Sequence, residues 1–186
     1  MIDLNRRNLV LAAGGAVAAV ALGAPARAQA PARKLGYAIV GLGSYGLGVI
    51  IPQFKHCQHS RLVALVSGDD AKARRVAAEH GVPERNLYNY KNFDSIRDNP
   101  EIDIVYVCLP VSMHAEYTIR AAGAGKHVMC EKPMATSSAD AREMIEACDK
   151  AGVKLMIAYR SQYEKHHRKL LEHVRSGRLG ALKLIE

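Results

Sequence analysis

The residues whose types and spacing most clearly suggest chemistry are three glycines, Gly41, Gly43 and Gly46, in the pattern G-x-G-x-x-G. They follow an apolar run, Tyr37 to Val40, and precede a helical pattern. In a dinucleotide site the first glycine permits a tight bend, the second lets a pyrophosphate approach the backbone, and the third lets helix and strand pack closely. Free N–H groups and the positive end of the helix dipole attract the phosphates. The pattern predicts nucleotide contacts from six consecutive residues: Gly41, Leu42, Gly43, Ser44, Tyr45 and Gly46.

A turn of this kind is also found as a plain connection, so its surroundings decide between the two interpretations. A second strand-like run, Leu62 to Val66, begins about 20 residues after the turn, as a βαβ unit requires. We therefore interpret the turn as a dinucleotide-binding turn.

Lys132 is the sharpest candidate for a catalytic residue. It follows the strand-like run His127 to Cys130 and lies between Glu131 and Pro133. A lysine at such a strand end can hydrogen-bond a sugar hydroxyl and assist proton movement as hydride leaves the adjacent carbon. The alternative is a surface lysine in a turn.

A second candidate, His114, follows the strand end Leu109-Pro110 and falls on the first turn of a predicted helix that faces the same crevice. The alternative is a capping or surface histidine.

The end of the second strand indicates the choice of cofactor. Proteins that prefer NAD usually have an acidic residue there for the ribose hydroxyls, whereas NADP requires cations for the 2′-phosphate. This chain has Ser67 at the strand end, and Lys72 and Arg75 at the start of the next helix. Asp69 and Asp70 favour NAD weakly, although both also suit a helix N-terminus. The pattern favours NADP, with NAD as the alternative, and an exposed helix face is the alternative role for the two cations.

Strand-like and helical patterns alternate along the chain, which predicts an α/β fold with a doubly wound parallel sheet and right-handed crossovers. Strands are expected at 37–40, 61–67, 102–109, 127–130 and 153–158, and the main helices at 46–54, 71–80, 113–124, 137–151 and 164–176. Ligands bind at the carboxyl ends of such strands. The candidate groups all follow strands, so the order of the chain predicts one site, which Tyr159-Arg160 also flanks.

Composition excludes several classes of protein. The chain has 186 residues, enough for one domain or for one domain and a fragment of another, and its 49% hydrophobic content is typical of globular proteins. The net charge of +8 comes from scattered cations without a basic block, so no nucleic-acid partner is expected. The four cysteines form no C-x-x-C pair, and no histidines have the spacing of metal ligands, so we expect free thiols and no metal site.

Residues 1–30 are expected to be an export signal rather than part of the fold. A charged start, Arg6-Arg7, precedes an apolar run rich in alanine and glycine, and Ala26-Arg27-Ala28 has the pattern of a cleavage site. The paired arginines favour the twin-arginine route to the periplasm, with no stable membrane association after cleavage. A Sec signal or an uncleaved anchor is the alternative.

Several motifs together resemble the family of glucose–fructose oxidoreductase, inositol dehydrogenase and related sugar dehydrogenases. They are residues 40–43, Leu109-Pro110 with His114 four residues on, residues 125–134 around Glu131-Lys132-Pro133, and residues 156–160. Residues 57–60 and 64–68, with the N-terminal signal, are similar to the branch that pairs glucose oxidation with fructose reduction. The resemblance extends over about residues 35–186.

The resemblance implies an NAD(P)-binding Rossmann domain at 31–160, followed at 161–186 by the start of a truncated α/β domain for substrate binding and homo-oligomer formation. It implies that NADP is held by Gly41 to Gly46, Ser67 and Lys72, that Lys132 is catalytic, and that the nicotinamide side is lined by Leu109, Pro110, Glu131 and Arg160.

The implied reaction oxidises an aldose, such as glucose to gluconolactone, and reduces a ketose, such as fructose to sorbitol, with tightly bound NADP. Since family members have a complete second domain, this chain is expected to be a fragment that binds NADP without turning over sugar alone. The alternatives are a related sugar or polyol dehydrogenase with exchangeable NAD(P), and a non-catalytic dinucleotide-binding protein.

Overall fold

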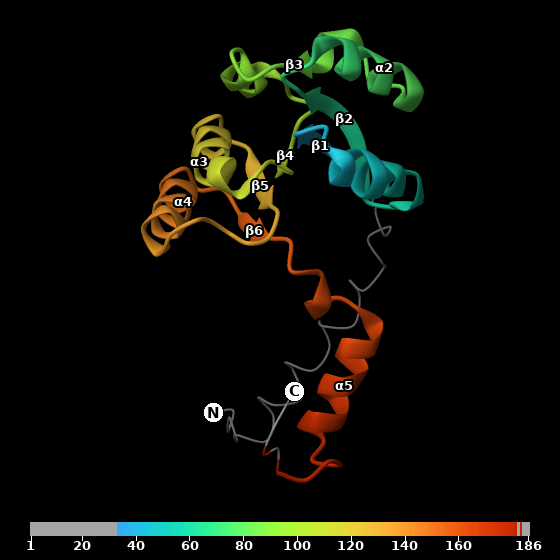
Figure 1. Cartoon of the computed structure of the whole chain (residues 1–186), viewed down its shortest axis with the longest axis vertical. Coiled ribbons are helices and arrows are strands. Elements are labelled where there is room, and N and C mark those ends of the chain that lie inside the picture. Colours follow the sequence, from blue (N-terminus) through green and yellow to red (C-terminus); the bar gives the residue numbers. More distant parts are fainter. Residues whose placement is uncertain (1–32, 182, 184–186) are drawn as a thin grey trace, which may run out of the picture. The chain divides into compact units, whose positions relative to one another are not determined.

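The computed structural model describes residues 33–181 and 183 (Figure 1). The predicted export signal at 1–30 lies outside these residues, as does most of the apolar run that ends the chain.

Six parallel strands form one sheet in the order β3-β2-β1-β4-β5-β6. β1, β2 and β3 form one half of the sheet, and β4, β5 and β6 form the other, with β1 and β4 as neighbours in the centre. Each half is built outward from the centre, and the chain returns to the centre between β3 and β4, as in a doubly wound fold. The predicted fold class is therefore confirmed. The strands are β1 (Leu35–Val40), β2 (Ser60–Val66), β3 (Leu87–Tyr88), β4 (Ile104–Val107), β5 (His127–Cys130) and β6 (Leu155–Ile157).

Helices and short helical turns connect the strands. The longer ones are α2 (Asp70–His80), α3 (His114–Gly123), α4 (Ser138–Lys150) and α5 (Lys165–Arg175). The short ones are η1 (Gly46–Ile50), η2 (Ile51–His56), η3 (Glu84–Asn86), η4 (Phe93–Asp98), η5 (Val111–Met113) and η6 (Arg160–Gln162). The helix expected at 46–54 is instead a π-helical turn followed by a 3₁₀ turn, because Pro52 has no N–H to donate to an α-helical bond.

Each face of the sheet has its own apolar core because successive strand residues point to opposite faces. Val40, Val66 and Val107 point to one face, where they pack with Tyr117 of α3 and Met144 of α4. Figure 1 shows α3 and α4 lying together against this half of the fold.

Ile39, Leu65 and Tyr106 point to the other face and pack with Ile51 of η2 and Val76 of α2. Each fully buried side chain of this size contributes about 1.5–3 kcal/mol relative to its exposed state. The two cores together fix which face of the sheet every strand residue occupies.

Two predicted helix starts are confirmed. Ser137 accepts a hydrogen bond from the backbone N–H of Asp140 and caps α4, and Asp69 accepts one from the backbone N–H of Lys72 and caps α2. Each such cap contributes about 1 kcal/mol. The cap of α2 places Lys72 in the first turn of that helix, close to the end of β2.

Candidate dinucleotide site

The carboxyl ends of the strands are aligned in one row. Val40 is in register with both Val66 and Val107, Val107 with Cys130, and Cys130 with Ile157. The residues that follow this row are Gly41, Ser67, Cys108, Glu131 and Ala158. The pairing continues into this second row, because Gly41, Cys108 and Glu131 each donate a backbone hydrogen bond to a neighbouring strand. The structure thus brings the predicted strand-end residues to one edge of the sheet.

The three glycines of the turn have different environments. Gly41 has φ +97°, and a Cβ there would lie 2.6 Å from the carbonyl oxygen of Cys108. A Cβ on Gly46 would lie 2.7 Å from the carbonyl oxygen of Gly41, whereas one on Gly43 would meet no atom within 4 Å. The fold itself therefore requires Gly41 and Gly46. The open space next to Gly43 is where a pyrophosphate would approach the backbone, so the turn fits a dinucleotide.

A groove of about 350 Å³ opens at this edge of the sheet. The predicted site residues that line it are Gly41, Leu42, Gly43, Ser67, Lys72, Leu109 and Pro110, together with Gly68, Asp69, Tyr90 and Cys108. Leu42 is only 4% exposed because its side chain packs in the core with Ile39, Ile51 and Leu65. The groove joins the glycine turn to the ends of β2 and β4.

At the end of β2, the groove combines one hydroxyl with one cation. Ser67 is buried, and its hydroxyl oxygen accepts a hydrogen bond from the backbone N–H of Asp69 at 3.1 Å. One carboxylate oxygen of Asp69 caps α2, and the other lies 3.9 Å from Nζ of Lys72. Lys72 lines the groove, whereas the equally anticipated Arg75 is exposed on α2 and does not. Of the two predicted cations, only Lys72 lies where it could meet a group bound in the groove.

Tyr90 is a groove residue that sequence reasoning missed. Its ring lies so close to Gly68 that a Cβ on the glycine would be 3.0 Å from it. In the sequence, the only sign that Tyr90 could line a site is that an aromatic residue comes shortly after a very short strand. An aromatic residue at such a position is equally typical of the core.

Glu131 and Lys132 occupy contrasting environments. Glu131 is buried, with Oε1 accepting a hydrogen bond from the hydroxyl of Tyr106 at 2.5 Å and Oε2 accepting one from the backbone N–H of Lys132 at 3.1 Å. The Lys132 side chain is exposed and makes no ion pair with the described residues. The backbone of Lys132 is thus held by a buried carboxylate, while its side chain is exposed. The peptide bond from Lys132 to Pro133 is cis.

Tyr45 and Arg160 approach each other beside Glu131. The Arg160 guanidinium carbon lies 5.7 Å from the centre of the Tyr45 ring, within the range of a cation–π contact. The Tyr45 hydroxyl is buried and has no hydrogen-bond partner among the described residues. Burial, followed by the negative charge of Glu131, raises the pKa of Tyr45 despite the opposing charge of Arg160. The hydroxyl is therefore a neutral, buried group close to the Glu131 carboxylate. Ser44, in the same turn, is exposed.

Cys108 lies in the groove wall as a neutral thiol, because burial and then the charge of Glu131 raise its pKa well above the usual range. All four cysteines are free thiols, as expected.

Within residues 33–181 and 183, no group of three or more His, Cys, Asp or Glu side chains could hold a metal ion. In the same part of the chain, no helix combines the length and the apolar character that crossing a membrane requires.

His114 is placed differently from the expectation that it faces the crevice. Its side chain is 1% exposed, and its ring nitrogens Nδ1 and Nε2 each lie 2.9 Å from a backbone carbonyl oxygen, those of Pro133 and Leu109. Because both nitrogens already have partners, the ring supports the walls of the groove and offers no free nitrogen to a cofactor.

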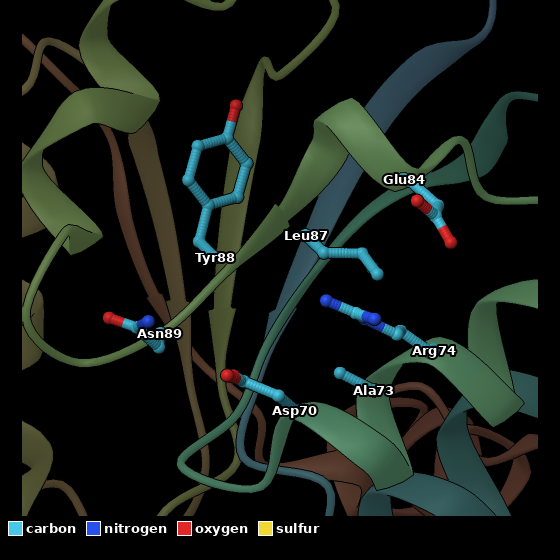
Figure 2. A pocket seen from close by; sticks show the side chains of 7 residues that line it. All are labelled: Asp70, Ala73, Arg74, Glu84, Leu87, Tyr88 and Asn89. Atoms are coloured by element: carbon cyan, nitrogen blue, oxygen red, sulfur yellow. The ribbon is translucent and has the colours of Figure 1, made fainter.

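A second pocket, of about 190 Å³, lies next to β3 and the first turns of α2. Figure 2 shows Asp70 and Arg74 of α2 lying across this pocket from Leu87, Tyr88 and Asn89. None of the predicted site residues lines it. The strand-end groove is therefore the candidate functional site.

Comparison with known proteins identifies the family of the chain. Residues 35–159 match the model of the Gfo/Idh/MocA family, described as an oxidoreductase family with an NAD-binding Rossmann fold. The chain is 34% identical over 143 residues to D-xylose 1-dehydrogenase (NADP(+)) 2 of Haloferax volcanii. This alignment covers 76% of this chain and 42% of the relative. It is 31% identical over 142 residues to myo-inositol 2-dehydrogenase of Thermotoga maritima, over 76% of this chain and 41% of the relative.

Among solved structures, the aldose-aldose oxidoreductase of Caulobacter crescentus, complexed with glycerol, is similar with a TM-score of 0.77 and 55% sequence identity. The similarity covers 78% of this chain and 43% of that protein. The chain thus spans less than half the length of the relatives that it matches. Because the family match covers the sheet, the glycine turn and the Glu131-Lys132 turn, the chain belongs to the Gfo/Idh/MocA family of oxidoreductases.

Proposed function

We propose that this chain is the nucleotide-binding portion of an NADP-dependent sugar oxidoreductase. The observation that carries the proposal is the groove itself, in which the open backbone at Gly43 and the cation of Lys72 line one continuous surface. A buried hydroxyl, Ser67, stands where proteins that prefer NAD have a carboxylate, and the nearby Asp69 carboxylate caps α2. This combination suits a dinucleotide with a 2′-phosphate.

In this proposal each residue has a defined task. Backbone N–H groups from Gly43 to Gly46 bind the pyrophosphate, and Lys72 binds the 2′-phosphate. Leu109, Pro110 and Arg160 form the nicotinamide side of the site. When bound, NADP supplies the hydride acceptor. Lys132 hydrogen-bonds the reacting sugar hydroxyl and assists removal of its proton, while Tyr106 and Glu131 fix the backbone that carries Lys132.

The substrates we propose are an aldose, with glucose oxidised to gluconolactone, and a ketose, with fructose reduced to sorbitol by the same tightly held NADP. A second aldose is the competing acceptor, favoured by the 55% identity to the aldose-aldose oxidoreductase. We also propose export to the periplasm through residues 1–30 and assembly of the whole enzyme as a homo-oligomer. Replacement of Arg6-Arg7 by Lys-Lys should abolish periplasmic recovery if the twin-arginine route is used.

Two matched glycine substitutions test nucleotide binding. Alanine at Gly43 or at Gly48 would meet no atom within 4 Å, and neither position has positive φ, so both variants should unfold at a urea concentration no lower than that of the wild type. Only Gly43→Ala places a methyl group in the groove, and it should weaken NADPH binding about tenfold in a fluorescence titration. Equal affinity in the two variants would contradict the proposed site.

Sugar chemistry is tested separately, because the chain spans less than half the length of its relatives. The purified, dialysed chain is mixed with glucose, and the reduced-nicotinamide absorbance band is recorded without added cofactor. A band would demonstrate tightly held NADP and a competent sugar site, and its loss on adding fructose or a second aldose would identify the acceptor. We expect bound NADP without a band from the 186-residue chain alone.

A further inference from the structure

The buried imidazole of His114 lies between two turns that are distant in sequence. One turn follows β4 and contributes the carbonyl oxygen of Leu109, 2.9 Å from Nε2. The other follows β5 and contributes the carbonyl oxygen of Pro133, 2.9 Å from Nδ1. Carbonyl oxygens only accept hydrogen bonds, so a neutral imidazole, which has one N–H, donates to one of the two oxygens and packs against the other, and an imidazolium donates to both. In either form one side chain lies between two walls of the site.

These two walls have different roles in the proposed function. Leu109 lines the groove, on the side assigned to the nicotinamide. Pro133 directly follows Lys132, so its carbonyl oxygen anchors the backbone on the C-terminal side of that lysine. The imidazole therefore sets the distance between the nicotinamide wall and the turn that carries the lysine.

The Lys132 turn is also held from its other end. Glu131 accepts a hydrogen bond from the backbone N–H of Lys132 at 3.1 Å, and Tyr106 holds Glu131 in place. The residues on both sides of Lys132 are thus fixed by buried side chains, while the lysine side chain itself is exposed. Of the two anchors, only His114 also contacts the groove wall after β4.

We propose that His114 is a positioning residue, which holds the Lys132 turn in register with the nicotinamide wall by bridging the carbonyl oxygens of Leu109 and Pro133. This inference rests on the proposed function, because it assumes that the nicotinamide lies against Leu109. It assigns no contact between His114 and the cofactor. The bridge should affect the nicotinamide half of the site and leave the adenosine half, around Ser67 and Lys72, unchanged.

Two substitutions separate the two contacts of the ring. The amide of asparagine stands at the δ position of the side chain, so His114→Asn can keep the hydrogen bond to Pro133 and lose the one to Leu109. The amide of glutamine stands at the ε position, so His114→Gln can keep the bond to Leu109 and lose the one to Pro133. His80→Gln, at an exposed position on α2, is the matched control.

The experiment compares two probes on the 186-residue chain: NADPH, and 2′-phospho-ADP-ribose, which lacks the nicotinamide. Because the nicotinamide is assumed to lie against Leu109, we expect His114→Asn, which loses the bond to that wall, to weaken NADPH binding about tenfold and to leave 2′-phospho-ADP-ribose binding within about twofold of the wild type. His114→Gln keeps that bond and should weaken NADPH binding less than His114→Asn does, and His80→Gln should change neither affinity. The ratio of the two affinities is insensitive to a general loss of folded protein.

Parallel losses for both probes in the His114 variants, together with lower unfolding midpoints, would overturn the proposal in favour of a purely structural role. Unchanged binding of both probes would also overturn it. If the wild-type chain binds neither probe, the proposed function itself fails, and this outcome is distinct from a failure of the positioning role.

Discussion

The hydroxyl of Tyr106, in the middle of the sheet, donates a hydrogen bond to the buried carboxylate of Glu131 at 2.5 Å. Tyr106 lies on β4 and Glu131 directly follows the adjacent strand β5. The other oxygen of the same carboxylate accepts a hydrogen bond from the backbone N–H of Lys132. A single buried carboxylate therefore connects the core of the sheet to the turn that carries the candidate catalytic residue.

Tyr106→Phe should destabilise the fold by about 1–3 kcal/mol, because it leaves one oxygen of the buried Glu131 without its donor. The pH dependence should change as well. Burial, followed by the hydrogen bond to Glu131, raises the pKa of Tyr106 above its ordinary value of 10.0. Below pH 10 this tyrosine is protonated in both the folded and unfolded states. Above pH 10 the unfolded state releases the proton first, so stability falls as pH rises.

Urea unfolding between about pH 8 and 11 tests both effects of the Tyr106 substitution. The variant should be less stable at pH 8 and should lose less stability above pH 10 than the wild type. Tyr163→Phe, at a position that is 61% exposed, is the control and should match the wild type throughout. If stability falls equally steeply above pH 10 in the Tyr106→Phe and Tyr163→Phe variants, Tyr106 does not contribute to the alkaline loss of stability.

Gly41→Ala should destabilise the protein by more than about 2 kcal/mol, since it combines positive φ with a collision against the Cys108 carbonyl oxygen. Gly125→Ala separates the two causes, because Gly125 has φ +73° and a Cβ there would meet no atom within 4 Å. The difference in unfolding free energy between the two variants measures the cost of the collision. If the two variants lose the same amount of unfolding free energy, the Gly41 turn has moved away from β4 and avoids the collision.

Lys72→Gln should weaken NADPH binding about tenfold and leave NADH binding unchanged, because the lysine is expected to contact only the 2′-phosphate. Arg75→Gln removes a charge of the same sign from an exposed position of the same helix that does not line the groove. The affinity of the Arg75→Gln variant for NADPH should stay within about twofold of the wild-type value. Calorimetric titration of both nucleotides gives the comparison, and a larger effect at Arg75 would reverse the assignment.

Acid should destabilise the fold partly through Asp103. Burial alone would raise the pKa of this carboxyl group, but hydrogen bonds from the Gly36 N–H and the Arg33 guanidinium outweigh burial, so its pKa is lowered from 3.8. The resulting stability is present above pH 3.8 and is lost as pH falls through the lower pKa of the folded state. Asp103→Asn should therefore flatten the decline of stability below about pH 4, relative to wild type and to Asp149→Asn on an exposed face of α4.

The parts of the molecule that follow from local patterns could be predicted from the sequence. Continuous apolar runs identify β1, β2, β4 and β5, and parallel topology requires that the residues after them share one edge. The gathering of Gly41, Ser67 and Glu131 at that edge follows directly. The assignment of Lys132 as catalytic and the boundary near residue 160 stay predictions.

The contacts that define the chemistry could not be predicted, because they depend on which way single side chains point. Tyr106 looks in the sequence like one more apolar residue of β4, and its partner lies 25 residues further along the chain. His114 has the spacing of a crevice residue, yet its ring turns inward to two carbonyl oxygens. Lys72 and Arg75 are equivalent as cations on one helix, and only three-dimensional structure separates them.

The inward position of Leu42 affects how the site meets its ligand. Leu42 lies between the two glycines that give the turn its freedom, yet its side chain is held in the core by Ile51 and Leu65. The conformational entropy of the turn is therefore lost when the protein folds rather than when a nucleotide arrives. A loop that is already ordered needs no rearrangement before capture, so the association rate should be governed by diffusion and by the charge of Lys72.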